Sequence, residues 1–344
     1  PSRLVGSEMC IRDRTSTVLN TLDGNTTGAV NAATVLTLTG TVTTINTAYA
    51  SSGISGLGNE AVTLTDTSLA ADALNTTNTN TTGTVTVQAT TVTGTAGNLV
   101  TAYGAQGSGI DGLGNEAVTV SSGSASVSQV NTLTAATTGT VTATVSDGDM
   151  STLAGISESG NVLTITVTDT SAAADALNTL DGKTTVAIDA SAITTITGTG
   201  ADALTAFESE GITGLTFDAT SYLASYSDLL SAFGSDTSAA QSHYFASGVS
   251  EGRSFDSFDE SIYLASHTDL LSAFGTNTIA ALSHYINFGF SESRSTDSFN
   301  EFSYIASHSD LIKALGANGE EGTAHYIAHG YSEGRTTCLL YTSD

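Results

Sequence analysis

Three histidines recur at one position of a repeated segment, and histidine is a common zinc ligand and proton carrier near neutral pH. His243, His284 and His325 lie 41 residues apart. A zinc site would draw its ligands from three separate copies, with no nearby cysteine. A Ser–His–Asp active site in three equal copies would be unusual. The pattern favours a structural histidine that hydrogen-bonds a neighbouring carboxylate or carbonyl.

An arginine and an aspartate recur with the same spacing. We expect Arg253 to pair with Asp228 or Glu251 and so to hold its copy of the segment together. The second copy keeps Glu292 and Arg294 although a serine replaces the glycine between them, which suits an ion pair. The predicted repeat-defining structural residues are Tyr222, Asp228, His243, Arg253, Tyr263, Asp269, His284, Arg294, Tyr304, Asp310, His325 and Arg335.

The elements that must position these residues are helices. Phe217 and Asp218 predict a helix start at which the phenylalanine contacts Tyr222 four positions beyond the cap. We expect this helix to end at Gly234 and a second helix to run to Gly248. The sequence therefore predicts three stacked helical-hairpin repeats of 41 residues in the range 217–337.

A different repeat fills residues 15–216. Its copies begin with LNTLDGNTTGAV at position 19 and are spaced 55, 56 and 47 residues apart. In the range 61–66, valine and leucine alternate with threonine, as in a half-buried strand. Asp66 and two hydroxyl residues then precede the short helical pattern 69–74. Two strand–helix units per copy, in four copies, predict a parallel β/α solenoid.

Two alternatives stay open for this region. A string of immunoglobulin-like sandwiches would need more strands and fewer of the Ala-Leu helical patches. Alternating threonines, as in Thr63-Leu-Thr65, would also suit a flat threonine array of the kind that ice-binding solenoids use. A solvated strand face is the favoured explanation, because the threonines fall on strands of unequal phase.

The charge excludes several classes of function. The chain has 344 residues and a formal charge of −26, which argues against binding to nucleic acid or to an anionic membrane surface. No apolar run is long enough to insert into a membrane. P-loop and HExxH motifs are absent from the sequence, and we do not expect an enzyme.

The two ends differ from the rest of the chain. Residues 1–14 and 338–344 resemble translated sequencing-adapter sequence, and we treat them as non-native tails. They hold both cysteines, Cys10 and Cys338, whose disulfide pairing we do not expect. Such tails predict that the chain is an internal fragment of a longer protein.

Calcium is a separate candidate ligand. Asp66, Asp147 and Asp149 lie in loops whose carboxylate and carbonyl oxygens suit this ion. Single acidic residues at strand ends are more often helix caps, and Lys183 argues against a further loop at Asp181. No cofactor is predicted.

The segment YLASYSDLLSAFGSDTSAAQSHYFASGVSEGR, from Tyr222 to Arg253, resembles tandem repeats of large secreted or surface proteins of marine cyanobacteria and proteobacteria. The threonine-rich units likewise resemble the repeat tracts of giant bacterial adhesins. The resemblance implies an extracellular or cell-surface location and a non-catalytic structural or adhesive role, with other surface proteins or envelope glycans as partners. It carries no assigned chemistry onto single residues.

Two further readings remain. One is a glycan- or cell-envelope-binding module whose exposed aromatics, such as Tyr226, Phe290 and Tyr331, stack on sugar rings. The other is the non-catalytic region of a secreted enzyme.

Overall fold

The computed structural model describes residues 12–337, and contacts divide the chain into two compact units. Unit 1 holds the chain up to Asp169 together with 176–192 and 209–214. Unit 2 holds 170–175, 193–208 and the chain from Leu215 onward. Cys10 and Cys338 lie outside the described residues.

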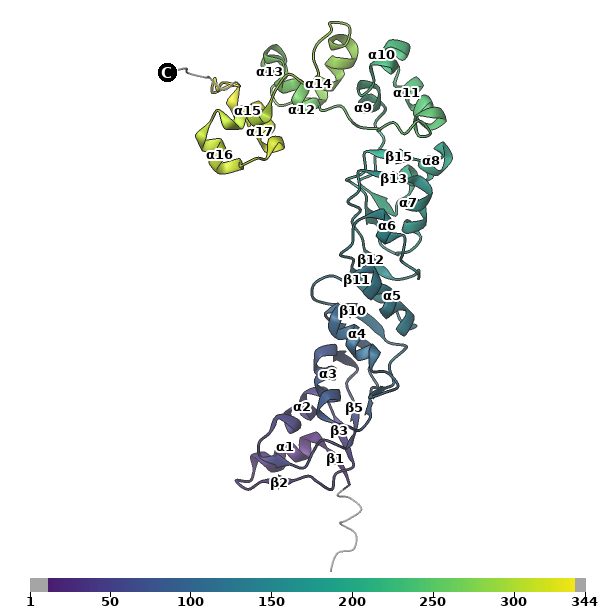
Figure 1. The fold of residues 1–344 in the computed structure, drawn as a ribbon, viewed down its shortest axis with the longest axis vertical. Coiled ribbons are helices and arrows are strands. Elements are labelled where there is room, and N and C mark those ends of the chain that lie inside the picture. Colours follow the sequence, from purple (N-terminus) through teal and green to yellow (C-terminus); the bar gives the residue numbers. More distant parts are fainter. Residues whose placement is uncertain (1–11, 338–344) are drawn as a thin grey trace, which may run out of the picture. The chain divides into compact units, whose positions relative to one another are not determined.

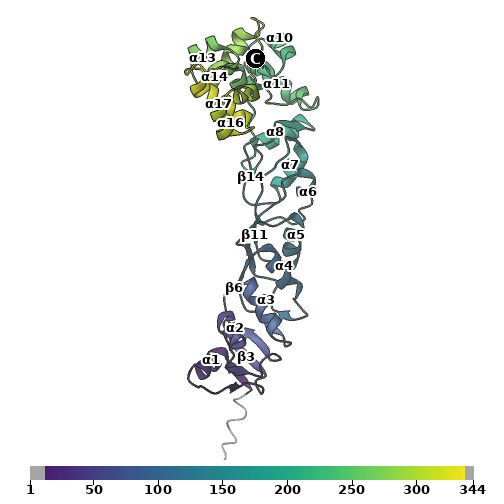
Figure 2. The ribbon, with the colours of Figure 1, turned by 60° about the vertical axis from the view of Figure 1, so that its left-hand side comes forward.

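Unit 1 alternates short strands with short helices (Figures 1 and 2). Its helices are α1 (Ser16–Gly24), α2 (Val42–Ala50), α3 (Ala71–Asn80), α4 (Ala96–Gly104), α5 (Val127–Ala136) and α6 (Met150–Leu153), and α7 (Ala174–Asp181) begins in unit 2 and ends in unit 1. Its strands are β1 (Asp13–Thr15), β2 (Val30–Asn31), β3 (Thr37–Gly40), β4 (Ile54–Ser55), β5 (Ala61–Leu64), β6 (Ser68–Ala70), β7 (Val85–Thr86), β8 (Thr91–Gly94), β9 (Ile110–Asp111), β10 (Ala117–Val120), β11 (Val141–Thr144), β12 (Val162–Thr164), β14 (Ile188–Asp189) and β16 (Ile212–Thr213).

Every strand pair in unit 1 is parallel. One sheet has the order β1-β3-β5-β7-β9 and another has β12-β11-β10-β8-β6, while β2 pairs with β4 and β14 with β16. Leu38, Val62 and Val85 stand side by side in the first sheet and are fully buried. A parallel sheet connected by helices confirms the predicted β/α solenoid and excludes immunoglobulin-like sandwiches, whose sheets are antiparallel.

The first strand begins inside the predicted tail. Asp13 and Arg14 form β1 with Thr15 and pair with β3. Backbone pairing of this kind depends little on side chains, so the foreign origin of the tail stays a prediction.

The threonines of the first sheet form a single outer row. Thr15, Thr39, Thr63 and Thr86 occupy neighbouring register positions, and the row ends at Asp111. Thr37 begins a second row, but Ala61 interrupts it in β5. This sheet therefore does not present the flat double array considered from the sequence.

Unit 2 consists of a small β/α part and three helical repeats. In the β/α part, β13 (Ser171–Ala173) pairs in parallel with β15 (Thr195–Thr197), and α8 (Gly200–Glu208) follows. The repeats contain α9 (Ala219–Ala224), α10 (Ser227–Phe233), α11 (Thr237–His243) and η1 (Tyr244–Gly248); α12 (Glu260–Ala265), α13 (Thr268–Phe274), α14 (Thr278–His284) and η2 (Tyr285–Gly289); and α15 (Glu301–Ala306), α16 (Ser309–Leu315), α17 (Gly319–His325) and η3 (Tyr326–Gly330). Figure 1 shows the three groups of helices in chain order.

The predicted first helix of each repeat is two helices. Tyr226 is extended, with φ −135° and ψ 111°, and separates α9 from α10. His267 and His308 have the same conformation at the equivalent positions. The apolar pattern continues through the break because both short helices turn apolar residues inward, so spacing alone did not reveal it.

The predicted capping residues act as expected. Asp218 accepts from the Thr220 amide at the start of α9, and Gly234 ends α10 with φ 59°. Phe217 contacts Tyr222 with ring centroids 5.8 Å apart. It also stacks on Tyr244, at 4.6 Å and an interplanar angle of 21°. The same stacked pair recurs in the other two repeats.

The first helical repeat packs on α8. Phe207, near the end of α8, makes edge contacts with the rings of Phe217, Tyr244, Phe245 and Phe255. This aromatic cluster places the last threonine-rich helix in the same compact unit as the helical repeats.

Among residues 12–337, no helix combines the length and the apolar content that crossing a bilayer requires.

Candidate functional site

The recurring histidine of each helical repeat bonds the recurring tyrosine. Tyr222 Oη lies 2.9 Å from His243 Nδ1. The corresponding distances are 3.0 Å for Tyr263 and His284, and 2.8 Å for Tyr304 and His325. The sequence predicted a carboxylate or carbonyl partner for histidine. A tyrosine takes this place because its ring fills the core between the helices while its hydroxyl reaches the partly buried imidazole.

Burial changes the acidity of both partners. It raises the pKa of the Tyr263 and Tyr304 hydroxyls to about 12. Burial and then the nearby arginine lower the pKa of His284 and His325. Near neutral pH each of these two pairs therefore joins a protonated hydroxyl to a neutral ring, so the hydroxyl can donate to Nδ1. Such a tyrosine is a poor acid, and the arrangement suits a structural hydrogen bond.

The backbone after the recurring histidine forms a π-helix, which passes close to the recurring tyrosine. The chain leaves α11 at His243 and continues as η1, where the Val249 amide donates to the Tyr244 carbonyl at 3.0 Å. A Cβ on Gly248 would lie 2.6 Å from Tyr222 Oη, so only glycine allows this approach. Equivalent glycines end η2 and η3. The π-helix was not predicted from the sequence, although the recurrence of glycine at the position of Gly248 was its visible signal.

The recurring arginine bonds two carboxylates. Arg253 donates to both oxygens of Asp228, at 3.1 and 2.8 Å, and to Glu251 at 2.6 Å. In the other copies, Arg294 bonds Asp269 and Glu292, and Arg335 bonds Asp310 and Glu333. The bond to Arg253 lowers the pKa of Asp228. The arginine thus ties the end of a repeat to the first turn of its second short helix.

The residue at the break between the first two helices of a repeat contacts either the recurring arginine or the residue that follows it. The Arg253 guanidinium lies 4.7 Å from the ring centre of Tyr226. In the other copies, His267 Nε2 lies 2.9 Å from the Ser295 carbonyl, and His308 Nε2 lies 3.0 Å from the Thr336 carbonyl. These two histidines fix the segment that follows the arginine.

The calcium candidates serve as helix caps. Asp66 accepts from the Val42 amide at 2.8 Å, and Asp147 from the Val127 amide at 2.7 Å. Each carboxylate therefore caps the helix of the preceding strand–helix unit. Asp149 accepts from the Thr152 amide at 2.9 Å. Asp181 accepts from the Ser209 hydroxyl at 2.7 Å. In the part of the chain that the structure describes, no group of three or more His, Cys, Asp or Glu residues could hold a metal ion.

Asparagines join neighbouring helices of unit 1. In α1, α2, α3 and α5 the residue after a buried leucine, isoleucine or valine is asparagine, and its side-chain amide donates to a backbone carbonyl of the next strand–helix unit. The bonds run from Asn20 to Thr44, from Asn46 to Ala73, from Asn75 to Asn98 and from Asn131 to Gly155, at 2.7–2.9 Å. Repetition of asparagine at one helix position was the available signal.

Two buried glutamates were also missed. Glu116 is 1% exposed and accepts from the Gly114 amide at 2.7 Å, the Asn115 amide at 3.0 Å and the Tyr103 hydroxyl at 3.1 Å. Glu60 is bound in the same way by Gly58, Asn59 and Tyr49. Burial raises the pKa of Tyr103. The repeated GLGNE motif thus forms a loop closed around its own carboxylate.

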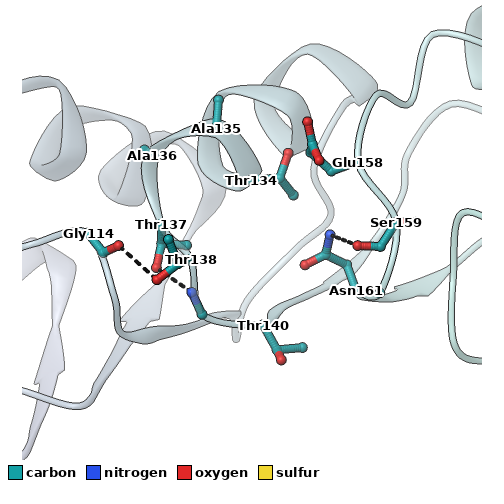
Figure 3. Close-up of a pocket in the computed structure, with 12 residues that line it drawn as sticks. Gly114, Thr134, Ala135, Ala136, Thr137, Thr138, Thr140, Glu158, Ser159 and Asn161 are labelled. Carbon is teal, nitrogen blue, oxygen red and sulfur yellow. Dashed lines mark hydrogen bonds between the residues drawn. The ribbon is translucent and has the colours of Figure 1, made fainter.

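A polar groove of about 530 Å³ lies where the third copy is shortened. Figure 3 shows Thr137 and Thr138 on one side, and Glu158, Ser159 and Asn161 on the other. The helix of this unit, α6, has four residues, whereas α2 and α4 have nine each. The five residues by which α6 is shorter make up part of the difference between the copy spacings of 56 and 47 residues. The lining offers hydroxyl and backbone groups and one carboxylate.

The predicted stacking platforms are not exposed rings. Tyr226, Phe290 and Tyr331 are all partly buried. Phe290 and Tyr331 pack edge-on against Tyr285 and Tyr326, respectively, with centroids 6.4 and 6.5 Å apart. The prediction that these three rings are exposed is therefore wrong, because the π-helix turns the last two toward the core.

Other rings are exposed instead. Phe288 is 58% exposed and Phe302 is 52% exposed. They occupy different positions of the repeat, so they do not form a periodic platform.

Comparison of the chain with protein-family models, with curated proteins and with solved structures gives no match.

Proposed function

We propose that this chain is a non-catalytic repeat region of a large extracellular bacterial surface protein, in which it acts as a spacer and interaction surface. The observation that carries the proposal is the use made of the recurring polar side chains. The tyrosine–histidine pairs and arginine clusters bond within a repeat. The asparagines and capping aspartates bond between neighbouring strand–helix units of unit 1. Residues repeated for chemistry would instead present free groups to a shared cleft.

The acidity supports the same role. A charge of −26 keeps a long exposed chain soluble and discourages binding to nucleic acid. The partners that fit are other surface proteins or envelope glycans, whose recognition does not require clustered cations.

The location can be tested on intact cells of the organism that encodes the chain. Antibodies raised against residues 15–337 should label cells without permeabilisation, and external protease should remove the labelling. An antibody against a cytoplasmic protein serves as the control for cell integrity. Labelling that needs permeabilised cells would rule out a surface location.

Glycan binding is the second candidate, favoured by exposed Phe288 and Phe302. Aromatic rings of this kind stack on sugar faces. A glycan array should then show binding that falls when both rings are replaced by alanine. A matched double replacement of exposed Val18 and Leu22 in α1 should leave binding unchanged. Binding that is the same for the wild-type chain and the phenylalanine variant would remove this candidate.

A further inference from the structure

The interface between neighbouring helical repeats occurs twice in unit 2. Helix α9 of the first repeat contacts α14 and η2 of the second, and α12 of the second contacts α17 and η3 of the third. Ser225 at the end of α9 accepts from the Ser257 amide, at 3.0 Å, in the connector that leads to the second repeat. Ser266 accepts in the same way from the amides of Ser298 and Phe299. The two interfaces therefore use equivalent positions.

Within residues 12–337, the third repeat presents the same face without a cover. Leu230 and Leu271 are each 3% exposed, whereas Ile312 at the equivalent position is 50% exposed. Ala224 and Ala265 are buried, but Ala306 is exposed. Phe302 lies on the same helix as Ala306 and is exposed as well. Ala306 and Ile312 thus keep apolar side chains at positions that are buried in the first two repeats, each of which is followed by another repeat. Phe302 adds a third apolar side chain where the first two repeats have Thr220 and Ser261.

We propose that the face formed by Phe302, Ala306 and Ile312 is a docking surface for one further helical repeat of the same 41-residue type. The inference concerns assembly and does not depend on the extracellular location proposed above. The occupant is chosen by continuity with the two interfaces already present.

A detail of the first interface indicates which kind of repeat fits. Ser221 donates to Glu260 of the second repeat at 3.4 Å. Ser303 occupies the position of Ser221 in the third repeat, whereas the second repeat has Ile262 there. The docking repeat should therefore carry a glutamate at the position of Glu260, as the second repeat does.

A second copy of the whole chain fits this face less well. The complementary surface of the first repeat is already covered, because η1 contacts α8 and Phe207 packs against Tyr244 and Phe245. A Cβ on Gly200 of α8 would clash with the Phe245 carbonyl, which shows how closely the two backbones approach. Head-to-tail association of two chains through the helical repeats would have to displace this packing.

The test extends the full chain by one repeat. A copy of residues 254–294 is placed directly after Arg335, in place of residues 336–344, and amide hydrogen exchange is measured over 301–315. We expect exchange in that segment to slow by about tenfold or more, toward the rate of the equivalent segment 260–274. The appended residues should be protected as well.

Ile312→Asp provides the matched control. In the original chain this change should leave exchange over 301–315 within about twofold, because the side chain is already exposed. In the extended chain it should abolish the added protection. Unchanged exchange over 301–315 in the extended chain, or an unprotected appended repeat, would overturn the proposal.

Two other occupants give distinct results, each of which would also overturn the proposal. If a second copy were the occupant, the original chain would form a concentration-dependent dimer, and Ile312→Asp would dissociate it. If residues 338–344 were the occupant, amide exchange over 301–315 would be faster in a chain that ends at Thr337 than in the original chain.

Discussion

Tyr263 Oη and His284 Nδ1 lie 3.0 Å apart across one repeat, and the same pair closes the other two repeats at 2.9 and 2.8 Å. Tyr263 is fully buried, while the imidazole is partly buried. Removal of the hydroxyl would leave Nδ1 of the partly buried imidazole without this partner. We expect Tyr263→Phe to lower the free energy of unfolding by about 1–2 kcal/mol, measured by urea denaturation. Tyr331→Phe, at a partly buried ring, is the control and should change it by less than about 0.5 kcal/mol.

Stability should fall as the pH drops below about 6.5. The pKa of His284 and of His325 is lowered in the folded protein, so the unfolded chain binds protons first and gains stability relative to the folded chain. The loss ends once the pH is below the folded values. The urea midpoint at pH 5.5 should therefore be lower than at pH 7.5, and the double variant His284→Asn, His325→Asn should show a smaller difference. Equal midpoints for the wild-type chain at the two pH values would contradict this.

A second loss of stability should appear in more acidic solution. Hydrogen bonding to Arg253 and Arg335 lowers the pKa of Asp228 and Asp310, respectively. This stabilisation is complete above the ordinary aspartate pKa of about 3.9 and is lost as the pH falls through the lower folded values. Asp228→Asn should flatten the pH dependence below pH 4, which thermal melts at pH 2.5 and 4.5 would measure. Asp256→Asn is the control. Burial raises the pKa of this carboxyl, the opposite direction to Asp228, so its replacement should not flatten the pH dependence.

Ser293→Gly should stabilise the second repeat. Ser293 has φ 56°, and glycine occupies the equivalent positions, with φ 66° at Gly252 and 69° at Gly334. Because side chains disfavour this left-handed conformation, we expect a gain of about 0.5–1 kcal/mol in the free energy of unfolding. The reverse change, Gly252→Ser, should cost a similar amount. A Cβ there meets no atom within 4 Å, so the backbone conformation is the only source of the cost. A neutral or negative effect of Ser293→Gly in urea denaturation would show that φ does not limit stability here.

Glu116→Gln should destabilise unit 1. A glutamine keeps one acceptor oxygen but directs an amide group at the donors from Gly114, Asn115 and Tyr103. We expect a loss of about 2–3 kcal/mol, measured by urea denaturation, because hydrogen bonds to a buried charged group are removed. Glu158→Gln, at an exposed side chain, should have almost no effect and is the matched control. Equal stability of the two variants would disprove the structural role of the buried carboxylate.

Asp66→Ala should cost about 1 kcal/mol whether or not calcium is present. Its carboxylate caps α2 through the Val42 amide, which requires no ion. Thermal melts in millimolar calcium and in chelator should therefore coincide for both the wild-type chain and the variant. A higher melting temperature in calcium that disappears in the variant would restore this residue as an ion ligand.

The fold was predictable from the sequence because each unit repeats its own pattern. Alternation around Val62 placed a strand, and the Asp218–Tyr222 spacing placed a helix start. Helix breaks at Tyr226, His267 and His308 were not predictable, because the backbone turns there without glycine or proline.

The site was predictable only in part. The recurrence of histidine and arginine identified the important positions, and Arg253 bonds the carboxylates that its spacing suggested. The tyrosine partner of His243 required knowledge of the π-helix, which brings Gly248 against Tyr222. Exposure of the aromatic rings also depended on this turn, because no local pattern distinguishes a ring facing inward from one facing solvent.

The asparagine and aspartate bonds of unit 1 connect residues that are 19 to 27 positions apart in the chain. Closing such short loops costs little entropy, and proteins built from near-neighbour contacts fold quickly. Each strand–helix unit can therefore form as soon as the next one has been synthesised. Order can grow from one end of the chain to the other without waiting for a distant segment.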